Sequence, residues 1–444
     1  MTDHKPAVVP ANYLFPFALV TVLFSLWGFA NDITNPMVAA FKNILLISNF
    51  ESSLVQAAFY GGYCFMAIPA ALFIKRYSYK HGILMGLFLY GVGCLLFLPA
   101  GASKEFTAFL VAYFVMTCGL SFLETTANPY ILSMGPEETA TRRLNFAQAF
   151  NPLGSLTGMF VAGQFILENL DKTDEVGRAS LRDMDPDAFA ALQQADLGVI
   201  IGPYLILGLV VVAVMVAFLF ARLPNTRGEE QHDVRVLATL RRLLANPRYI
   251  QGVVAQAFYV GVQIMCWTFI IQYAQNELGM PKTTAQAWNI AAMVIFVSSR
   301  FICTYLLKFV DAGRLLMLLA IGGAGTILGT IFIHGTAGLV CLVATSACMS
   351  LMFPTIYGIA LKGLGPDAKL GAAGLIMAIG GGCLMPPLQG RIMDMDAFDL
   401  GFITLSSTRA SFVLSLVCFV VIAIYGVLTR TRRAAPGAAG HPAG

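Results

Sequence analysis

The sequence predicts an all-α membrane protein whose twelve transmembrane helices form two six-helix pseudo-repeats. Composition is the first reason, because 57% of the 444 residues are hydrophobic and only 12% are charged, whereas charged residues make up about a quarter of an ordinary soluble domain. Long apolar stretches are the second reason, since they recur along nearly the whole chain. The third reason is that short motifs of the first half return in the second half.

Each apolar stretch is long enough to be a membrane span, because about 20 helical residues at 1.5 Å per residue cross a hydrocarbon core of about 30 Å. We expect spans near residues 13–38, 52–74, 82–100, 106–133, 143–168, 197–221, 248–274, 283–307, 314–334, 336–361, 368–395 and 408–429. One lysine precedes the first span and no small-residue cleavage site follows it, so we expect a retained span rather than a removable signal.

Two polar stretches interrupt the apolar pattern. The stretch 223–247 divides six spans from six and contains no apolar run of spanning length. We therefore expect an N-terminal six-helix bundle at 1–222, a cytoplasmic connector at 223–247, a C-terminal six-helix bundle at 248–433 and a disordered Ala-, Gly- and Pro-rich tail at 434–444. The second polar stretch, 171–196, is rich in acidic residues and is predicted to be a short extracytoplasmic loop.

The two halves repeat each other in register. The repeated features are Leu144-x9-Gly154 and Leu370-x9-Gly380, the Gly-Pro-acid turns at 135–137 and 365–367 that precede them, and Trp27 and Trp267. Any single glycine match is also what ordinary helix packing through small residues produces. Several matches in register indicate a parallel duplication, which is the architecture of the major facilitator fold and places a substrate site between the halves near the midplane.

The distribution of basic residues predicts the orientation. With both termini in the cytoplasm, 19 of the 28 lysines and arginines lie inside, 8 lie outside and Arg300 falls within a span. This asymmetry obeys the positive-inside bias. We therefore expect a multi-pass protein of the bacterial inner membrane with both termini cytoplasmic.

Two acidic residues fall within predicted spans. Asp32 stands in an Asn-rich segment followed by Pro36, and Glu124 stands four residues before Asn128 and five before Pro129. A charged group inside a span is costly, so such an acid usually faces a wet cavity, has a partner or carries a proton. The prolines are expected to loosen each helix and free backbone carbonyls.

Three readings of these acids stay open. Burial favours the neutral form of a carboxyl group, which suits a group that takes up and releases a proton. Carboxylates and amides are equally good ligands for a sodium ion. A buried carboxyl kept neutral by hydrogen bonds would be structural. None of the five histidines lies in the middle of a span, so we expect no histidine proton relay.

A polar stripe lies on the fifth predicted span. Asn145, Gln148 and Asn151 recur every three residues and so lie approximately along one helix face. Carboxamides beside an aromatic face, here Trp27 or Trp267, are the chemistry expected of a hexose site. The alternative is that these amides join neighbouring helices. Arg300 either pairs with a cavity acid or extends to the membrane surface.

Several segments resemble the L-fucose:proton symporter permeases, of the fucose–galactose–glucose group of sugar porters. The segments are Leu26-Trp27-Gly28-Phe29-Ala30-Asn31, Glu124-Thr125-Thr126-Ala127-Asn128-Pro129-Tyr130, residues 143–151, residues 257–261, Cys266-Trp267 and Phe353-Pro354-Thr355-Ile356-Tyr357. The resemblance extends from Phe15 to about Gly390. It implies a central cavity between the halves that receives both sugar and proton.

The resemblance also implies roles for individual residues. Glu124 matches the glutamate implicated in proton coupling, and Asp32 is the second candidate for coupling to a proton or cation. The residues expected at the sugar site are Asn31, Asn35, Asn128, Gln148, Asn151, Trp27, Trp267, Gln263 and Phe353.

The first span departs from the pattern of the family. Known fucose carriers have an Asn-Asn-x-Asn-Asp series, whereas this chain reads Asn31-Asp32-Ile33-Thr34-Asn35. The acid has moved by three residues, about one turn or roughly 4.5 Å along the helix axis, and stays on the same face. This displacement leaves the identity of the sugar open, and also the choice between proton and sodium.

The function expected from the sequence is import of a monosaccharide, L-fucose or a related hexose, by symport with a proton. A sodium-coupled glucose/galactose symporter of the same fold is the alternative, and a non-sugar facilitator or exporter is a weaker one because the amide stripe is too polar. We expect no enzyme, since the spans contain neither a nucleophile with a base nor clustered metal ligands. We also expect no cofactor, metal or nucleic-acid partner, and a monomer whose surroundings are the lipid bilayer.

Overall fold

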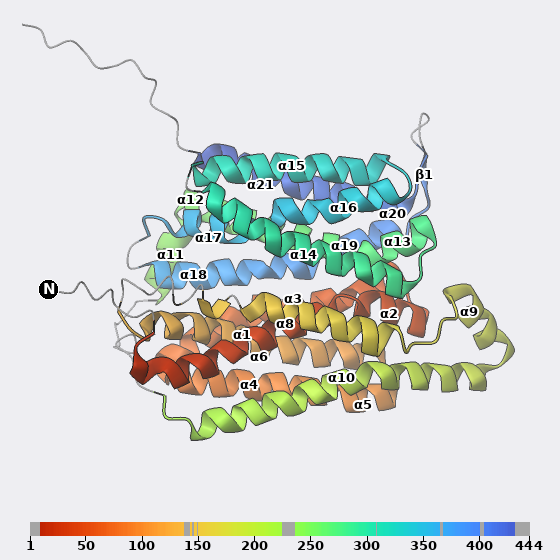
Figure 1. The fold of residues 1–444 in the computed structure, drawn as a ribbon, viewed down its shortest axis with the longest axis horizontal. Coiled ribbons are helices and arrows are strands. Elements are labelled where there is room, and N and C mark those ends of the chain that lie inside the picture. Colours follow the sequence, from red (N-terminus) through yellow and green to blue (C-terminus); the bar gives the residue numbers. More distant parts are fainter. Residues whose placement is uncertain are drawn as a thin grey trace, which may run out of the picture.

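The computed structural model describes residues 9–136, 143, 146–148, 150–223, 236–307, 309–364, 367–399 and 404–430. Its helices form two bundles that lie against each other, the first built from α1 to α10 and the second from α11 to α21 (Figure 1). Asn145 of the predicted stripe and the predicted tail at 434–444 lie outside the described residues.

Broken helices characterise the first bundle. Its elements are η1 (Ala11–Tyr13), α1 (Leu14–Thr34), α2 (Met37–Leu45), α3 (Asn49–Arg76), α4 (Tyr79–Leu95), α5 (Phe97–Ser103), α6 (Phe106–Ser133), α8 (Phe150–Val161), the π-helical turn η3 (Ala162–Leu167), α9 (Glu175–Met184) and α10 (Pro186–Phe220). The first span is interrupted at Asn35–Pro36 as predicted, because Pro36 has no N–H to donate to the carbonyl of Asp32. Pro129, the second proline expected to loosen a helix, does not interrupt it, since α6 continues through Pro129 to Ser133.

The second bundle has the same character. Its elements are α11 (Val236–Leu244), α12 (Pro247–Thr268), α13 (Ile270–Leu278), α14 (Lys282–Leu306), α15 (Ala312–Phe332), α16 (Thr336–Met349), α17 (Met352–Leu361), α18 (Ala368–Met377), η6 (Ala378–Gly380), α19 (Gly381–Met393), β1 (Phe398–Asp399), β2 (Thr404–Leu405), α20 (Ser407–Ser411) and α21 (Val413–Thr429). The two short strands pair antiparallel, with Phe398 opposite Leu405.

Eleven helical stretches within the described residues are long and apolar enough to cross a membrane. They correspond to eleven of the twelve predicted spans. The remaining prediction, near 143–168, is represented by α8 and η3, because the residues before Phe150 are only partly described.

The prediction of a short loop at 171–196 is wrong. This stretch contains α9 and the first three turns of α10, which extend beyond the other helices at the end far from the chain's N-terminus (Figure 1). Asp185 accepts a hydrogen bond from the backbone N–H of Ala188, and Pro186 occupies the first helical position. Both features start a helix regardless of hydropathy. Buried Arg178 of α9 forms an ion pair with Asp196 of α10, so the extension is packed.

The connector between the halves also contains a helix. Arg242 of α11 forms a two-point ion pair with Asp367 at the start of α18, with N–O distances of 2.7 and 2.9 Å. These hydrogen bonds lower the pKa of the Asp367 carboxyl below its ordinary value. Residues 224–235 of the connector lie outside the described part of the chain.

Gly154 lies where α8 crosses α1, but at the equivalent crossing of the second half the glycine is Gly381, since the predicted partner Gly380 lies against Cys64 of α3. A Cβ atom at Gly154 of α8 would collide with the carbonyl oxygen of Ser25 in α1. In the second half, a Cβ atom at Gly381, the residue after the predicted partner Gly380, would collide with the carbonyl oxygen of Ala257 in α12. Only glycine permits such close approach of two helix backbones, which explains why each crossing has a glycine.

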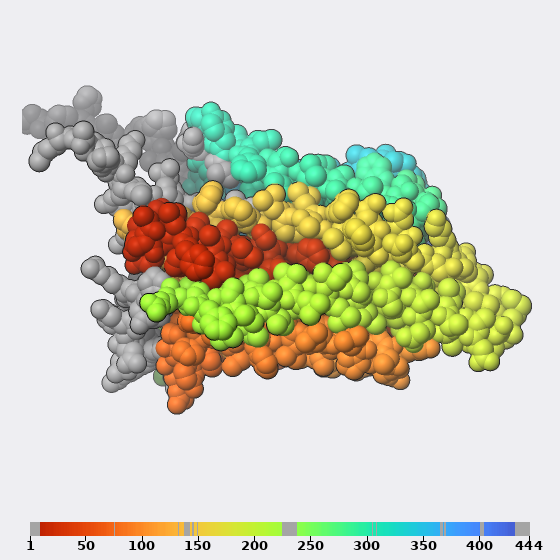
Figure 2. Space-filling model, turned by 60° about the horizontal axis from the view of Figure 1, so that its bottom comes forward, coloured from red at the N-terminus to blue at the C-terminus, as the bar shows by residue number. Residues whose placement is uncertain are grey.

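The halves meet along two seams. At one seam α3 packs on α18 and α19, and at the other α8 and η3 pack on α14. Figure 2 shows the second seam from outside, with α8 in yellow between α1 in red and the cyan helices of the second half. Asp394, which follows α19, accepts hydrogen bonds of 2.8 and 2.7 Å from the backbone N–H groups of Asn49 and Phe50 at the start of α3. Gln286 of α14 donates to the carbonyl of Met159 in α8. These contacts hold the halves together at the end predicted to be extracytoplasmic.

Candidate functional site

Asp32 is the centre of a polar cluster where α1 and α3 meet. Its carboxyl is 1% exposed, and its Oδ1 accepts a 3.0 Å hydrogen bond from the amide of Asn35. Gln56 of α3 donates to the other end of the Asn35 amide, also at 3.0 Å. The hydroxyl of Ser155 in α8 and the amide of Asn31 also interact with Asp32. The displaced acid is therefore embedded in a network of amides and a hydroxyl group.

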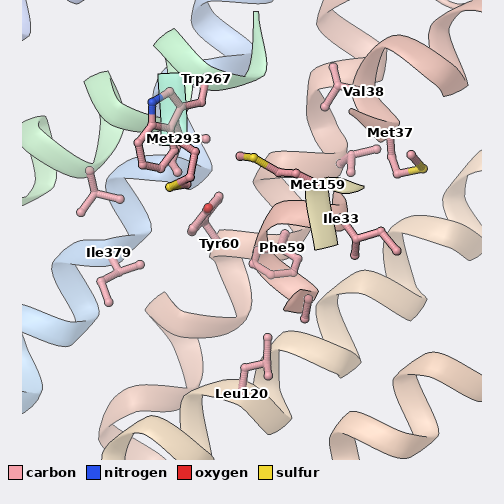
Figure 3. Packing of buried hydrophobic residues seen from close by; sticks show 14 of the residues in the cluster. Ile33, Met37, Val38, Phe59, Tyr60, Leu120, Met159, Trp267, Met293 and Ile379 are labelled. Atoms are coloured by element: carbon pink, nitrogen blue, oxygen red, sulfur yellow. The ribbon is translucent and has the colours of Figure 1, made fainter. Parts of the chain in front are cut away.

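Asn31 extends this cluster toward the boundary between the halves. Its amide oxygen accepts a 2.6 Å hydrogen bond from the hydroxyl of Tyr60 in α3. The Tyr60 ring in turn lies against Gly382 of the second half, where a Cβ atom would overlap it. Figure 3 shows Tyr60, Met159 and Trp267, from α3, α8 and α12, at the place where the two bundles face each other.

Glu124 lies in a second cluster, on α6. Its side chain is 6% exposed, and its Oε2 has no hydrogen-bond partner among the described residues. One turn further on, Asn128 donates to the backbone carbonyl of Glu124 at 3.1 Å and accepts a 3.0 Å hydrogen bond from Gln148. The structure therefore brings together three of the predicted site residues.

The surroundings of Glu124 include both halves. The carboxyl interacts electrostatically with Tyr63 of α3 and with Tyr357 of α17. Tyr63 belongs to the first bundle and Tyr357 to the second. A change in the charge of Glu124 therefore acts on a side chain of each bundle.

Two tyrosines on α3 lie between the clusters. Tyr60 interacts with Asp32 and Tyr63 with Glu124, and their rings are 6.4 Å apart and nearly parallel. The sequence reasoning missed these tyrosines and Gln56. Their spacing of four and then three residues, Gln56, Tyr60 and Tyr63, gives one polar face on an otherwise apolar span. This polar face is the signal in the sequence that marks the three residues.

The two described amides of the predicted stripe contact different neighbouring helices. Gln148 is exposed and contacts Asn128 in the Glu124 cluster. Asn151 instead donates a 3.2 Å hydrogen bond to the carbonyl of Phe24 in α1, so at least one of its donors joins neighbouring helices. Trp27 is half-buried and lies 6.4 Å from Tyr63, measured between rings.

The predicted aromatic site residues of the second half, Trp267 and Phe353, lie on α12 and α17. Trp267, 3% exposed, donates its indole N–H to the hydroxyl of Ser346 at 3.1 Å. Half-buried Phe353 stacks on Tyr357, with ring centroids 6.2 Å apart. Gln263 lies on α12, one turn before Trp267, and is partly buried.

The arrangement suits two kinds of chemistry. The Glu124 carboxyl group is buried, and its Oε2 has no hydrogen-bond partner among the described residues. A buried carboxyl group of this kind is suited to binding and releasing a proton. The amides of Asn128 and Gln148 offer donors and acceptors, and Tyr63 and Tyr357 offer aromatic rings, which together are what the binding of a sugar requires.

Comparison with known proteins shows the family of the chain. Residues 19–388 match the family model of the Major Facilitator Superfamily. The L-fucose-proton symporter of Haemophilus influenzae is 56% identical over 421 residues, covering 94% of this chain and 97% of that protein. The L-fucose-proton symporter of Escherichia coli is 34% identical, covering 88% and 89%. The glucose/galactose transporter of Brucella abortus is 29% identical and covers 96% of each chain.

Solved structures give the same result. The crystal structure of the transporter FucP in the outward conformation matches with a TM-score of 0.72 and 32% identity, covering 95% of this chain and all of that one. A D-xylose-proton symporter matches with a TM-score of 0.66 at 12% identity, covering 94% and 97%, which is a likeness of fold alone. The predicted twelve-helix fold class is thus confirmed. The chain belongs to the Major Facilitator Superfamily, in the group that contains the L-fucose-proton symporters and glucose/galactose transporters it resembles.

Proposed function

We propose that this protein imports L-fucose, or a closely related hexose, by symport with a proton. The observation that carries the proposal is the cluster of Glu124, Asn128 and Gln148. The Glu124 carboxyl group is buried, and its Oε2 has no hydrogen-bond partner among the described residues. The amides beside it are suited to binding sugar hydroxyls, and Tyr357 of the other half interacts with the carboxyl group. The identity of 56% to a protein named L-fucose-proton symporter supports the same substrates.

In this proposal the two binding events are coupled by their shared surroundings. Glu124 takes up the proton, and the sugar binds between its amides and the aromatic wall formed by Trp267 and Phe353. Asp32, with Asn31 and Asn35, senses the cation or holds a sugar hydroxyl. Because binding free energies are reciprocal, a proton that tightens sugar binding is itself held more tightly when sugar is bound. Rocking of the halves then exposes both to the other side.

Sodium coupling is the second candidate, and the Asp32 cluster is the observation that favours it. The Asp32 carboxylate accepts a hydrogen bond from the amide nitrogen of Asn35, and the side chains of Asn31 and Ser155 also interact with it. Carboxylate, amide and hydroxyl groups carry the oxygen ligands that a hard cation prefers, although a cation would have to take the place of these hydrogen bonds. Relatives named glucose/galactose transporters, at 29% identity, make it a comparison worth testing.

Uptake into proteoliposomes separates the candidates. Purified protein is reconstituted, and a pH gradient or a sodium gradient is imposed with labelled L-fucose, D-galactose or D-glucose. The proposal expects accumulation of L-fucose driven by the pH gradient and indifferent to sodium. Accumulation of glucose or galactose driven only by sodium would establish the second candidate instead.

The proposed orientation has both termini in the cytoplasm of a bacterium, with the protein acting as a monomer in the inner membrane. Reporter domains fused after Gly444 or inserted after Lys172, just ahead of α9, should give opposite signals. A reporter active only in the periplasm should respond at Lys172 and be silent at Gly444. The same signal at both positions would overturn the topology.

The amides of the stripe are expected to contribute to sugar affinity. Gln148→Ala and Asn151→Ala should each weaken binding about two- to twelve-fold, since one net hydrogen bond is worth about 0.5–1.5 kcal/mol. Calorimetric titration of the purified variants with L-fucose measures this. Asn151→Ala also removes a contact to α1, so its thermal unfolding must be compared with that of the parent. Parental affinity in both variants would mean that the stripe only joins helices.

A further inference from the structure

Arg300 lies inside a membrane span, and the transport scheme above gives it no role. It is partly buried on α14, where its guanidinium Nε donates a 3.1 Å hydrogen bond to the backbone carbonyl of Ser350. Its guanidinium carbon lies 4.9 Å from the centre of the Phe296 ring. A guanidinium in this environment is costly, and here it is held by a carbonyl and a ring at defined positions.

The carbonyl that Arg300 binds lies at a break in a helix. The tenth span consists of α16, which ends at Met349, and α17, which begins at Met352. Carbonyls at a helix end lack intrahelical donors, and hydrocarbon offers no water to replace them. Arg300 supplies the donor for Ser350, and the hydroxyl of Tyr259 in α12 supplies a 3.1 Å hydrogen bond to Met349. These two side chains therefore stabilise the break.

The break determines where Phe353 points, because α17 starts one residue before it. The Phe353 ring lies edge-on to Tyr259, with centroids 6.1 Å apart, and stacks on Tyr357. Tyr259 thus contacts both the break and the ring. Movement of the Arg300 side chain would release the start of α17 and with it Phe353.

A second route leads from Arg300 to Trp267. The Phe296 ring beneath the guanidinium packs edge-on against the Trp267 indole, with centroids 4.9 Å apart and planes at 85°. The other end of that indole donates to Ser346, one turn before the break. Trp267 is therefore held between Phe296 and α16. Arg300 contacts the Phe296 ring and donates to the carbonyl of Ser350, which follows the end of α16.

We propose that Arg300 is a positioning residue, which holds Trp267 and Phe353 in the orientation that receives the apolar face of the sugar. The proposal rests on the proposed function, since that function makes these two rings the aromatic wall of the sugar site. Arg300 acts through Phe296 and the Ser350 carbonyl and does not itself touch the sugar. Its replacement should therefore weaken sugar binding by reducing the contributions of Trp267 and Phe353 to the binding free energy.

A double-mutant cycle in sugar affinity tests this. L-Fucose is titrated into the purified parent, Arg300→Gln, Trp267→Phe and the double variant. Arg300→Gln should bind about tenfold more weakly, as expected for displacement of a stacked ring. Arg300→Gln should cost less affinity in the Trp267→Phe background than in the parent, because coupled residues are not additive and only the effect through Phe353 remains. Arg430→Gln, which alters an exposed arginine after α21, is the matched control and should bind like the parent.

Tryptophan fluorescence tests the positioning without any sugar. The chain has only three tryptophans, so Trp27→Phe/Trp288→Phe leaves Trp267 as the sole indole. Adding Arg300→Gln should shift its emission, whereas adding Arg430→Gln should not. If Arg300→Gln does not fold, Arg300→Lys takes its place. It keeps the cation over Phe296 but lacks the Nε donor, so a smaller shift and a smaller loss of affinity are expected.

The outcomes separate the two proposals. Additive effects in the cycle together with unchanged emission would overturn the positioning role and leave the proposed function intact. Shifted emission in a protein whose Trp267→Phe variant binds sugar like the parent would support the positioning of the indole but overturn its place in the sugar site. A role confined to folding would lower the unfolding temperature and leave the cycle additive, and would also overturn the proposal.

Discussion

Replacing Glu124 with glutamine should abolish gradient-driven accumulation of sugar while leaving exchange of sugar across the membrane at least partly intact. The carboxyl group is buried, and its Oε2 has no partner within the described part of the chain, so it can accept a proton without breaking an existing hydrogen bond. Glutamine is permanently neutral and cannot carry a proton through a cycle. The loaded carrier can still reorient, because exchange needs no net movement of protons.

The size of the effect is set by the imposed gradient. One pH unit is worth about 1.4 kcal/mol, so a carrier that moves one proton with each sugar approaches about tenfold accumulation. Glu124→Gln should give an accumulation ratio of about one. Accumulation and counterflow are measured in the same proteoliposome preparations. Glu105→Gln is the matched control, since Glu105 is exposed at the start of the same helix. If Glu124→Gln concentrates sugar as the parent does, Glu124 is not the proton carrier.

The grouping of Glu124 with Asn128 and Gln148 could be predicted from the sequence for a physical reason. An acid within an apolar span must be explained, so it attracts attention at once, and Asn128 follows it by one helical turn. Tyr60, Tyr63 and Gln56 are not among the predicted site residues, because one amide and two tyrosines do not form a run of like polar residues such as the stripe of Asn145, Gln148 and Asn151. Their importance depends on which face of α3 turns toward the other helices, and that is decided by packing.

The spans themselves could be predicted because the thickness of the bilayer dictates their length. Breaks within spans were predictable only in part. Pro36 identifies the break after α1, and Pro354, which has no N–H to donate to the carbonyl of Ser350, marks the break between α16 and α17 in the same way. That break depends on donors from Tyr259 and Arg300, which are distant in sequence. The helices of 171–196 were missed because hydropathy measures apolar length and not capping.

Replacing Asp32 with asparagine should weaken coupling or sugar affinity, and restoring an acid one turn later should rescue it at least partly. In the structure Asn35 donates to the Asp32 carboxyl, and Gln56 donates to the oxygen of Asn35. In Asp32→Asn/Asn35→Asp the direction of the first hydrogen bond is reversed, because the new amide at 32 donates to the new carboxyl at 35. Gln56 continues to donate to an oxygen at 35. The exchange therefore preserves every hydrogen bond of this chain of groups while moving the acid by about 4.5 Å along the helix.

Accumulation and exchange in the single and double variants decide the role of Asp32. Asp32→Asn should lose most of the accumulation of the parent, and the double variant should regain a measurable part of it. Asn35→Asp alone is the contrasting variant. It replaces the amide that donates to the Asp32 carboxyl with a second carboxyl group. It should therefore disturb transport even if the double variant is active. If Asp32→Asn accumulates and exchanges sugar like the parent, Asp32 is a structural residue and the interpretation of the first span fails. If Asp32→Asn is impaired and Asp32→Asn/Asn35→Asp transports no better, the cluster needs its acid at position 32. That requirement would distinguish this chain from carriers that have the acid one turn later.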